Sequence, residues 1–200
     1  METLHDLFED TLKDVYYAEN AILTALPKMM KAASAKALQA AFAGHLEETK
    51  AQIKRLDEVF DILDVKPAAK ECHAIKGLIA EGEELIAEKP EAAVLDAALL
   101  ATAQAVEHYE MARYGTLRAW ADQLGLSNAA MLLQQTLAEE KATDAKLSVL
   151  ALGGVNMQAD DGEHPAATQH RPAGAAGHDK DADATRKSGA PRQKSAAAGR

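Results

Sequence analysis

The 200-residue chain is poor in aromatic residues, glycine and proline, and it has a single cysteine. Three Phe, four Tyr and one Trp make up 4% of the sequence, which is unlike an all-β protein. Twelve glycines and six prolines are too few for a fibrous or wholly low-complexity chain. The lone Cys72 cannot form an internal disulfide, so a disulfide-stabilised secreted scaffold is disfavoured.

Long apolar runs and a leader segment are lacking as well. No stretch reaches the roughly 20 uninterrupted apolar residues that are needed to cross a bilayer. The first residues do not place a charged segment before an apolar one, as a secretory leader does. We therefore expect a soluble protein of the reducing cytoplasm that has no membrane partner.

The net charge of −9 is carried by the first three quarters of the chain. Residues 1–152 hold 25 of the 31 acidic residues but only 15 of the 22 basic ones. A surface with this excess of acid repels the phosphate backbone of nucleic acids. Nucleic-acid binding by the folded part is therefore not expected.

The composition changes at Gly153. From Gly153 onward the chain includes seven of the twelve glycines and three of the six prolines, and the only large apolar side chains there are Val155 and Met157. Such a segment buries too little apolar surface to offset the entropy that ordering costs. We therefore divide the chain into a helical domain at residues 1–154 and a disordered tail at residues 155–200. Five basic residues follow Asp183; they either solvate the end of the tail or contact an anionic partner weakly.

Helical periodicity runs through almost all of the first 152 residues. Apolar residues recur at spacings of three and four, as on one face of an α-helix, over residues 3–32, 36–64, 92–124 and 128–151. A shorter helix is predicted at residues 72–88. The first and last connections are short, so the long helices form two antiparallel hairpins, joined by a crossover that carries the short helix. This connectivity predicts an all-α, ferritin-like four-helix bundle.

Acidic residues interrupt the apolar face of every long helix. At about 100° per residue, seven polar side chains fall on or beside these faces: Glu19 on the first helix, His45 and Glu48 on the second, Glu107 and Glu110 on the third, and Glu140 and Asp144 on the fourth. Glu47 and His108 are expected to point away from the core, and Glu139 is expected to lie well off the apolar face. The seven lie within a turn or two of the helix midpoints, which are level in antiparallel helices of similar length. We therefore expect them to converge in one layer.

Converging buried carboxylates repel one another and are costly to desolvate unless a positive group neutralises them. Lys141 and Arg113 lie near this depth, but neither is squarely on an apolar face. Two metal ions, held about 3.5–4 Å apart by bridging carboxylates, would supply the charge. An oxygen-rich site with one imidazole favours iron or manganese over zinc. We expect Glu48 and Glu140 to be the bridges and the other five residues to be terminal ligands.

A second interpretation needs no metal. A single acid on such a helix is more often an edge residue that reaches water or pairs with a lysine. The protein is then a non-enzymatic helical module that acts through dimerisation or through its basic tail. Iron storage is a weaker third option, because a cage needs a particular assembly that helical periodicity does not indicate.

Five segments of the chain also carry a resemblance to known proteins. They read DVYYAENAI (14–22), AFAGHLEETKAQIKRL (41–56), GLIAEGEELI (77–86), DAALLATAQAVEHYEMARYGTL (96–117) and LAEEKATDAKL (137–147). In order and without large gaps, they resemble the YciE/YciF family of bacterial ferritin-like proteins. The resemblance implies a homodimer, a dimetal centre at the seven residues named above and an association with bacterial stress responses.

The pattern of ligands departs from that of other ferritin-like proteins. Those carry Glu-x-x-His on two helices, whereas the second helix here has His45 before Glu48 and the fourth has Asp144 and no histidine. Tyr16 and Tyr114 lie one turn from Glu19 and Glu110; they either order ligands, carry a radical or are core tyrosines with a hydrogen bond. The sequence thus predicts a di-iron or dimanganese protein that reacts with peroxide or dioxygen, with the metal-free module as the alternative.

Overall fold

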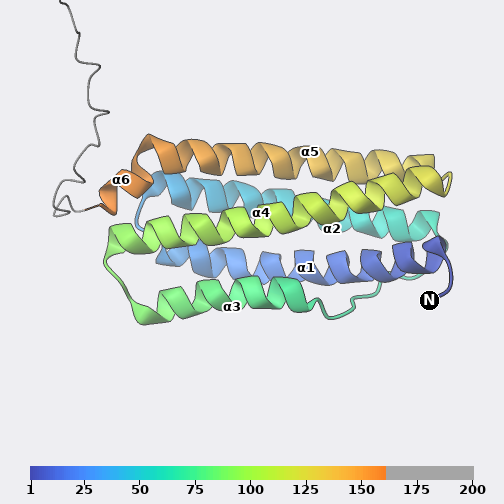
Figure 1. Cartoon of the computed structure of the whole chain (residues 1–200), viewed down its shortest axis with the longest axis horizontal. Coiled ribbons are helices and arrows are strands. Elements are labelled where there is room, and N and C mark those ends of the chain that lie inside the picture. The colour runs from blue at the N-terminus through green and yellow to red at the C-terminus, as the bar shows by residue number, and fades with distance from the viewer. Residues whose placement is uncertain (161–200) are drawn as a thin grey trace, which may run out of the picture. The chain divides into compact units, whose positions relative to one another are not determined.

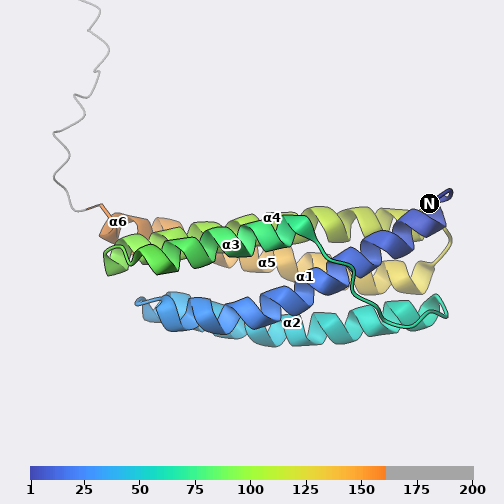
Figure 2. The ribbon, with the colours of Figure 1, turned by 90° about the horizontal axis from the view of Figure 1, so that it is seen from below.

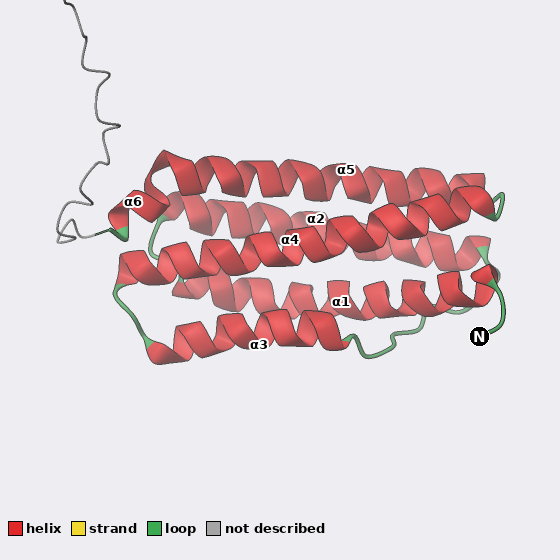
Figure 3. Ribbon diagram, in the orientation of Figure 1, coloured by secondary structure: helices red, strands yellow, loops and turns green. Residues whose placement is uncertain are grey.

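The computed structural model describes residues 1–160, and this part of the chain is built from helices (Figures 1 and 3). In chain order they are α1 (Leu4–Ala32), α2 (Lys36–Ile62), α3 (His73–Glu88), α4 (Ala92–Gln123), α5 (Ser127–Leu150), the π-helical turn η1 (Ala151–Val155) and α6 (Asn156–Gln158). The boundaries of α1 to α5 lie within two residues of those predicted. The predicted all-α fold is confirmed.

The four long helices form two antiparallel hairpins, α1 with α2 and α4 with α5 (Figures 1 and 2). The hairpins face each other so that α1 packs against α4 and α2 packs against α5. The crossover between α2 and α4 carries α3, which lies along α1 and α4. This is the ferritin-like connectivity that the two short loops and the long crossover predict.

Caps fix where the first hairpin begins and turns. At the start of α1, Thr3 and Asp6 form a capping box, each side chain accepting a hydrogen bond from the other residue's backbone N–H at 3.1 Å. No side chain of α2 caps its own helix. The buried Asp96 of α4 takes this part, accepting hydrogen bonds from the backbone N–H of Ser34 and Ala35 at 2.7 and 2.8 Å. The α1–α2 turn is thereby tied to the second hairpin.

Two apolar clusters occupy the two ends of the bundle. One contains Phe8, Leu12, Leu56, Phe60, Leu117 and Leu133. The other contains Ile22, Leu26, Leu38, Phe42, Ile75 and Leu99. The residues between these sets along each long helix include the buried polar side chains of Glu19, His45, Thr49, Gln52, Glu107, Glu110 and Glu140. A polar layer therefore divides the core near the middle of the bundle.

The helical structure continues slightly beyond residue 154, where we expect the domain to end. Val155 is buried in the apolar cluster of Leu38 and Phe42, and α6 follows it. Residues 161–200, which make up most of the expected tail, lie outside the described residues. None of the helices described up to residue 160 is long and apolar enough to span a membrane.

Candidate metal centre

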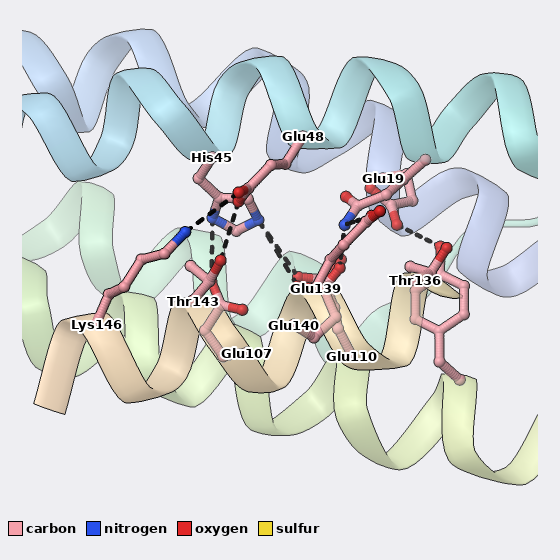
Figure 4. A network of polar contacts seen from close by, with 12 residues as sticks. Glu19, His45, Glu48, Glu107, Glu110, Thr136, Glu139, Glu140, Thr143 and Lys146 are labelled. Atoms are coloured by element: carbon pink, nitrogen blue, oxygen red, sulfur yellow. Dashed lines mark hydrogen bonds and ion pairs between the residues drawn. The ribbon is translucent and has the colours of Figure 1, made fainter. Parts of the chain in front are cut away.

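Every long helix contributes an acid or an imidazole to the polar layer (Figure 4). Glu19 comes from α1, His45 from α2, Glu107 and Glu110 from α4, and Glu140 from α5, and all five are buried. They lie where the apolar faces of the helices meet, so these side chains have little room to reach water. The layer predicted from the helix midpoints is present.

His45 lies among three carboxylates. Its Nδ1 is 3.0 Å from Oε1 of Glu107, and its Nε2 is 4.0 Å from Oε2 of Glu110 and 3.9 Å from Oε2 of Glu140. One ligand atom from each of these four residues lies within 4.8 Å of the others. This spacing is that of side chains grouped around a single position, and we call these four residues the central group.

Several metal-ligating atoms of the central group lack a hydrogen-bond partner among the described residues, namely both carboxylate oxygens of Glu110 and Nε2 of His45. Glu107 lies within hydrogen-bond reach of Nδ1 of His45, at 3.0 Å, and of Glu140. Buried polar atoms are normally paired, because an unpaired one costs about 1–3 kcal/mol. By contrast, Asp96, a buried acid on α4 like Glu107 and Glu110, accepts hydrogen bonds at both of its carboxylate oxygens. The central group differs in offering free oxygens and one imidazole nitrogen, a donor set that fits a hard or borderline metal cation.

Burial sets the protonation of these carboxyls in the absence of a cation. It raises the pKa of Glu107 to about 7, and together with the charge of Glu140 it raises that of Glu19 to about 8. Burial raises the pKa values of Glu110 and Glu140 well above the usual carboxyl range, and their carboxylate neighbours raise them further. Raised pKa values of this kind favour the protonated carboxyls over the carboxylates in the metal-free protein, and a bound cation can replace those protons.

Glu19 borders the central group and is held by a tyrosine. The hydroxyl of the fully buried Tyr114 donates a hydrogen bond to Oε1 of Glu19, and Oε2 is left without a partner among residues 1–160. Tyr114 therefore orients the carboxylate. Tyr16, the other tyrosine that the sequence places near the site, packs edge-on against Phe60, with the ring centroids 5.4 Å apart.

Glu48 and Asp144 lie outside the central group. Glu48 accepts a hydrogen bond from Oγ1 of Thr143 at 2.9 Å and pairs with Nζ of Lys146 at 3.3 Å (Figure 4). Asp144 Oδ1 lies 3.3 Å from Nε2 of the exposed His108. The charges of both acids raise the pKa of Glu107, so Glu48 and Asp144 lie beside the central group, near Glu107. The structure thus brings together four of the seven predicted ligands, with Glu19, Glu48 and Asp144 around them.

A second polar network, which the sequence did not reveal, adjoins Glu140. Nε2 of Gln52 donates to Oε1 of Glu140 at 2.5 Å and to Oε2 of Glu139 at 3.3 Å. The buried Arg55 makes two hydrogen bonds of 2.9 Å to the Glu139 carboxylate and one of 2.6 Å to Oγ1 of Thr136. This network holds one oxygen of Glu140 in place.

Two features of this network were not predicted. Glu139, which lies off the apolar face of α5, is half-buried against α2 because Arg55 pairs with it. The base beside the layer is Arg55 rather than Lys141, which is exposed, or Arg113, which contacts Asp14 and the ring of Tyr109. Arg55 follows Gln52 by three residues, and this spacing on one helical face was the available signal.

Comparison with known proteins gives consistent results. The sequence profile of a family described as a domain of unknown function, DUF892, matches residues 3–160. Protein YciF of Escherichia coli K12 is 48% identical over 161 residues, which cover 80% of this chain and 97% of YciF.

Solved structures agree with the sequence comparison. The crystal structure of the E. coli stress protein YciF superposes with a TM-score of 0.75 and covers 78% of this chain and 99% of that one. YcfI of Rhodopseudomonas palustris, a proposed structural protein, has 50% identity and a TM-score of 0.73, covering 74% and 94%. A Xanthomonas campestris protein at 16% identity and a TM-score of 0.60 shares the fold. The chain therefore belongs to the DUF892 family and is a relative of YciF, as the resemblance of its motifs predicts.

Proposed function

We propose that this protein holds two ions of iron or manganese and uses them to consume peroxide or dioxygen under stress. The observation that carries the proposal is the set of buried donor atoms without hydrogen-bond partners in the central group. In a protein without a ligand, such atoms are a cost to the fold. A site whose purpose is to bind cations accounts for that cost.

The choice of metal follows from the donor atoms. Carboxylate oxygens outnumber the single imidazole. The described part of the chain places no thiol at the site, and Sγ of Cys72 contacts the hydroxyl of Tyr109 at 3.1 Å instead. Oxygen-rich sites of this kind suit iron or manganese better than zinc. Arg55 does not neutralise the group, because both its amino groups are bound to Glu139.

The positions of the carboxylates suggest their roles. Glu140 is the best candidate for a bridging ligand, because it faces His45 on one side and its charge acts on both Glu19 and Glu110 on the other. His45 and Glu107 would hold one ion, and Glu19 and Glu110 the second. We keep Glu48 as a second bridge and Asp144 as a terminal ligand; binding then requires Glu48 to leave Thr143 and Lys146, and Asp144 to leave His108.

The surrounding residues would position these ligands. Bound iron or manganese supplies the redox chemistry with peroxide or dioxygen. Gln52 fixes one oxygen of Glu140 by its hydrogen bond, and Tyr114 fixes one oxygen of Glu19. Fixed carboxylates keep the site geometry constant as the charge at the site changes.

The biological setting is inferred from the relatives. E. coli YciF is described as a stress protein, and we extend that role, a cytoplasmic location and a homodimeric state to this chain. Sedimentation of the full-length protein tests the dimer. A monomer at every concentration would contradict that part of the proposal without affecting the metal site.

Metal analysis of protein purified without chelator tests the centre itself. We expect about two iron or manganese ions per chain, both lost in Glu140→Ala and Glu48→Ala, together with a carboxylate-to-iron absorption band in the iron form. Glu47→Ala is the matched control, because the Glu47 side chain is 70% exposed and pairs with the surface residue Lys50. A folded protein that stays metal-free after reconstitution with either ion would overturn the proposal.

That result would favour the metal-free helical module. In this case the buried carboxyls remain protonated, as their raised pKa values allow, and function lies in dimerisation or in the basic tail. Replacement of Glu140 by Gln would then leave every property of the protein except stability unchanged.

A further inference from the structure

An apolar pocket of about 30 Å³ lies beneath α3, between that helix, α1 and α4. Its walls include Ile22, Ala25, Met29, Ile79, Thr102 and Val106. Figures 1 and 2 show α3 running alongside α1 and α4, and residues of α3 line the pocket, so this helix forms its roof. The pocket is distinct from the bundle core because its outer wall is supplied by the crossover.

Helix α3 can lie close to α4 because residue 82 is a glycine. A Cβ atom on Gly82 of α3 would lie 3.0 Å from Cγ2 of Thr102 on α4, which is tighter than ordinary van der Waals contact. A larger residue at position 82 would therefore push α3 outward or displace Thr102. Glycine keeps the pocket narrow and closed on that side.

The lining of the pocket includes both surface residues and members of the central group. His45 and Glu107 line its inner part, and both are buried ligand candidates. Lys28 and Glu83 line its outer part, where they form an exposed ion pair of 2.6 Å. Exposed pairs of this kind contribute only about 0–1 kcal/mol, so this one does not close the pocket permanently.

Size and chemistry limit what the pocket can take. A single water needs about 10–15 Å³ of such volume, so the pocket holds a guest of about two heavy atoms. A bound water needs two or more polar partners, whereas these walls are almost wholly apolar between Lys28–Glu83 and His45–Glu107. A small apolar molecule is therefore favoured over water.

A second approach to His45 has the opposite character. A pocket of about 110 Å³ between α2 and α5 is lined by Gly44, His45, Glu48, Thr143 and Lys146, among others. Its charged groups suit ions and hydrogen-bonding molecules. An apolar guest gains nothing from these charged groups. The pocket between α2 and α5 therefore favours polar molecules, whereas the pocket beneath α3 favours apolar ones.

We propose that the pocket beneath α3 binds dioxygen and delivers it to His45 and Glu107. The use of the bound gas rests on the dimetal function proposed above, but its binding does not. Within this assignment α3 is the element that selects a small apolar oxidant, and Gly82 sets the width of its path.

Dioxygen binding can be measured in the metal-free, full-length protein, because dissolved dioxygen is paramagnetic and broadens nearby methyl resonances. With methyl-labelled protein, equal pressures of dioxygen and nitrogen are compared. We expect the methyl groups of Ile22, Ile79 and Val106 to relax several-fold faster under dioxygen than those of Leu117 and Leu133, which are buried in the other apolar cluster. Equal enhancement at both sets would overturn the proposal.

A pocket-filling variant checks that the pocket is the site. Ala25→Val adds two methyl groups to the wall and should remove the excess relaxation. Ala130→Val makes the same change in the other cluster and should preserve it. Should Ala25→Val not fold, xenon replaces the variant: as an apolar atom of similar size it should shift the same three methyls of the unaltered protein, and the absence of such shifts would count against the pocket.

Metal-loaded protein separates this proposal from the preceding one. Ala25→Val should bind iron with the stoichiometry of the unaltered protein and consume dioxygen several-fold more slowly, while its reaction with peroxide is unchanged. An unchanged rate with dioxygen would overturn delivery through the pocket. If the unaltered protein binds no metal but still shows the excess methyl relaxation under dioxygen, the dimetal function is overturned and the proposed dioxygen site is retained.

Discussion

The hydroxyl of Tyr114 on α4 donates a hydrogen bond to the carboxylate of Glu19 on α1. Both residues are fully buried, and they link the two hairpins at the edge of the central group. The bond favours the charged form of Glu19, but burial and the charge of Glu140 outweigh it and raise the pKa to about 8. Tyr114 therefore orients the carboxyl group without ionising it at neutral pH.

Tyr114→Phe removes that hydrogen bond and keeps the ring. We expect the free energy of unfolding of the metal-free protein to fall by about 1–3 kcal/mol, because a buried oxygen of Glu19 loses its partner. Chemical denaturation measures the change. Tyr17→Phe, at a half-buried tyrosine of the same helix as Glu19, is the control and should have a smaller effect. Equal effects of the two substitutions would argue against a role for the Tyr114 bond.

The stability of the metal-free protein should depend on pH in a defined direction. The pKa of Glu19 is raised from 4.5 to about 8 and that of Glu107 to about 7. Between these limits the folded state binds more protons than the unfolded state, so the free energy of unfolding falls as pH rises. We expect the fall to begin near pH 4.5, with the contribution of Glu19 and Glu107 complete above about pH 8.

Denaturation of metal-free protein across this pH range measures the effect. The same series on Glu19→Gln should show a shallower fall, because the proton that the raised pKa of Glu19 retains in the folded state is then absent. Stability that rises between pH 5 and pH 8 would contradict the burial of protonated carboxyls.

Glu110→Gln should raise the stability of the metal-free protein and lower its capacity to bind metal. Neither oxygen of Glu110 has a hydrogen-bond partner among the described residues, and burial raises its pKa well above the usual range. A neutral amide of the same shape avoids the cost of protonating the acid, so near pH 7.5 we expect the metal-free variant to be more stable by roughly 1–4 kcal/mol. Its metal content should fall.

Thermal or chemical unfolding and metal analysis of the same preparations check both halves. Glu47→Gln is the control, since this exposed glutamate faces away from the layer. A variant that loses stability and retains its full metal content would contradict our assignment of Glu110.

Arg55→Met tests the network beside Glu140. It removes both hydrogen bonds to Glu139 and the one to Thr136. The Glu139 side chain is 28% exposed and regains some hydration, so we expect a loss of about 1–3 kcal/mol in the free energy of unfolding. Adding Glu139→Gln should recover part of it, because the unpaired charge is then gone.

A double-mutant cycle of Arg55 and Glu139 gives the coupling energy. Lys50→Met, which breaks the exposed pair with Glu47, serves as the comparison and should cost only about 0–1 kcal/mol. Additive effects of the Arg55 and Glu139 substitutions would show that this ion pair is not coupled.

Most of the fold could be predicted from the sequence because its signals are local and repeated. Apolar spacing fixed the five helices, and the short loop after Ala32 and the Gly125 turn fixed the hairpins. The depth of the polar layer followed from helix lengths alone. These arguments need no knowledge of which rotamer a side chain adopts.

The detailed site could not be predicted in the same way. Helical phase places Glu48 and Glu140 on comparable positions, yet Glu140 faces His45 while Glu48 turns to Thr143 and Lys146. That difference depends on partners from another helix. Arg55 was missed for the same reason: a long side chain at the edge of an apolar face can turn inward when Glu139 is there to receive it.

The division of the core by its polar layer has a mechanical consequence. Apolar packing holds the helices together at both ends of the bundle. In the middle, buried carboxyl groups repel one another unless protons or cations neutralise them. Ions bound in the polar layer would link the two hairpins. Without these ions, the middle of the bundle would open locally before the ends do. The residues proposed to bind the metal would thus also determine where the metal-free bundle first opens.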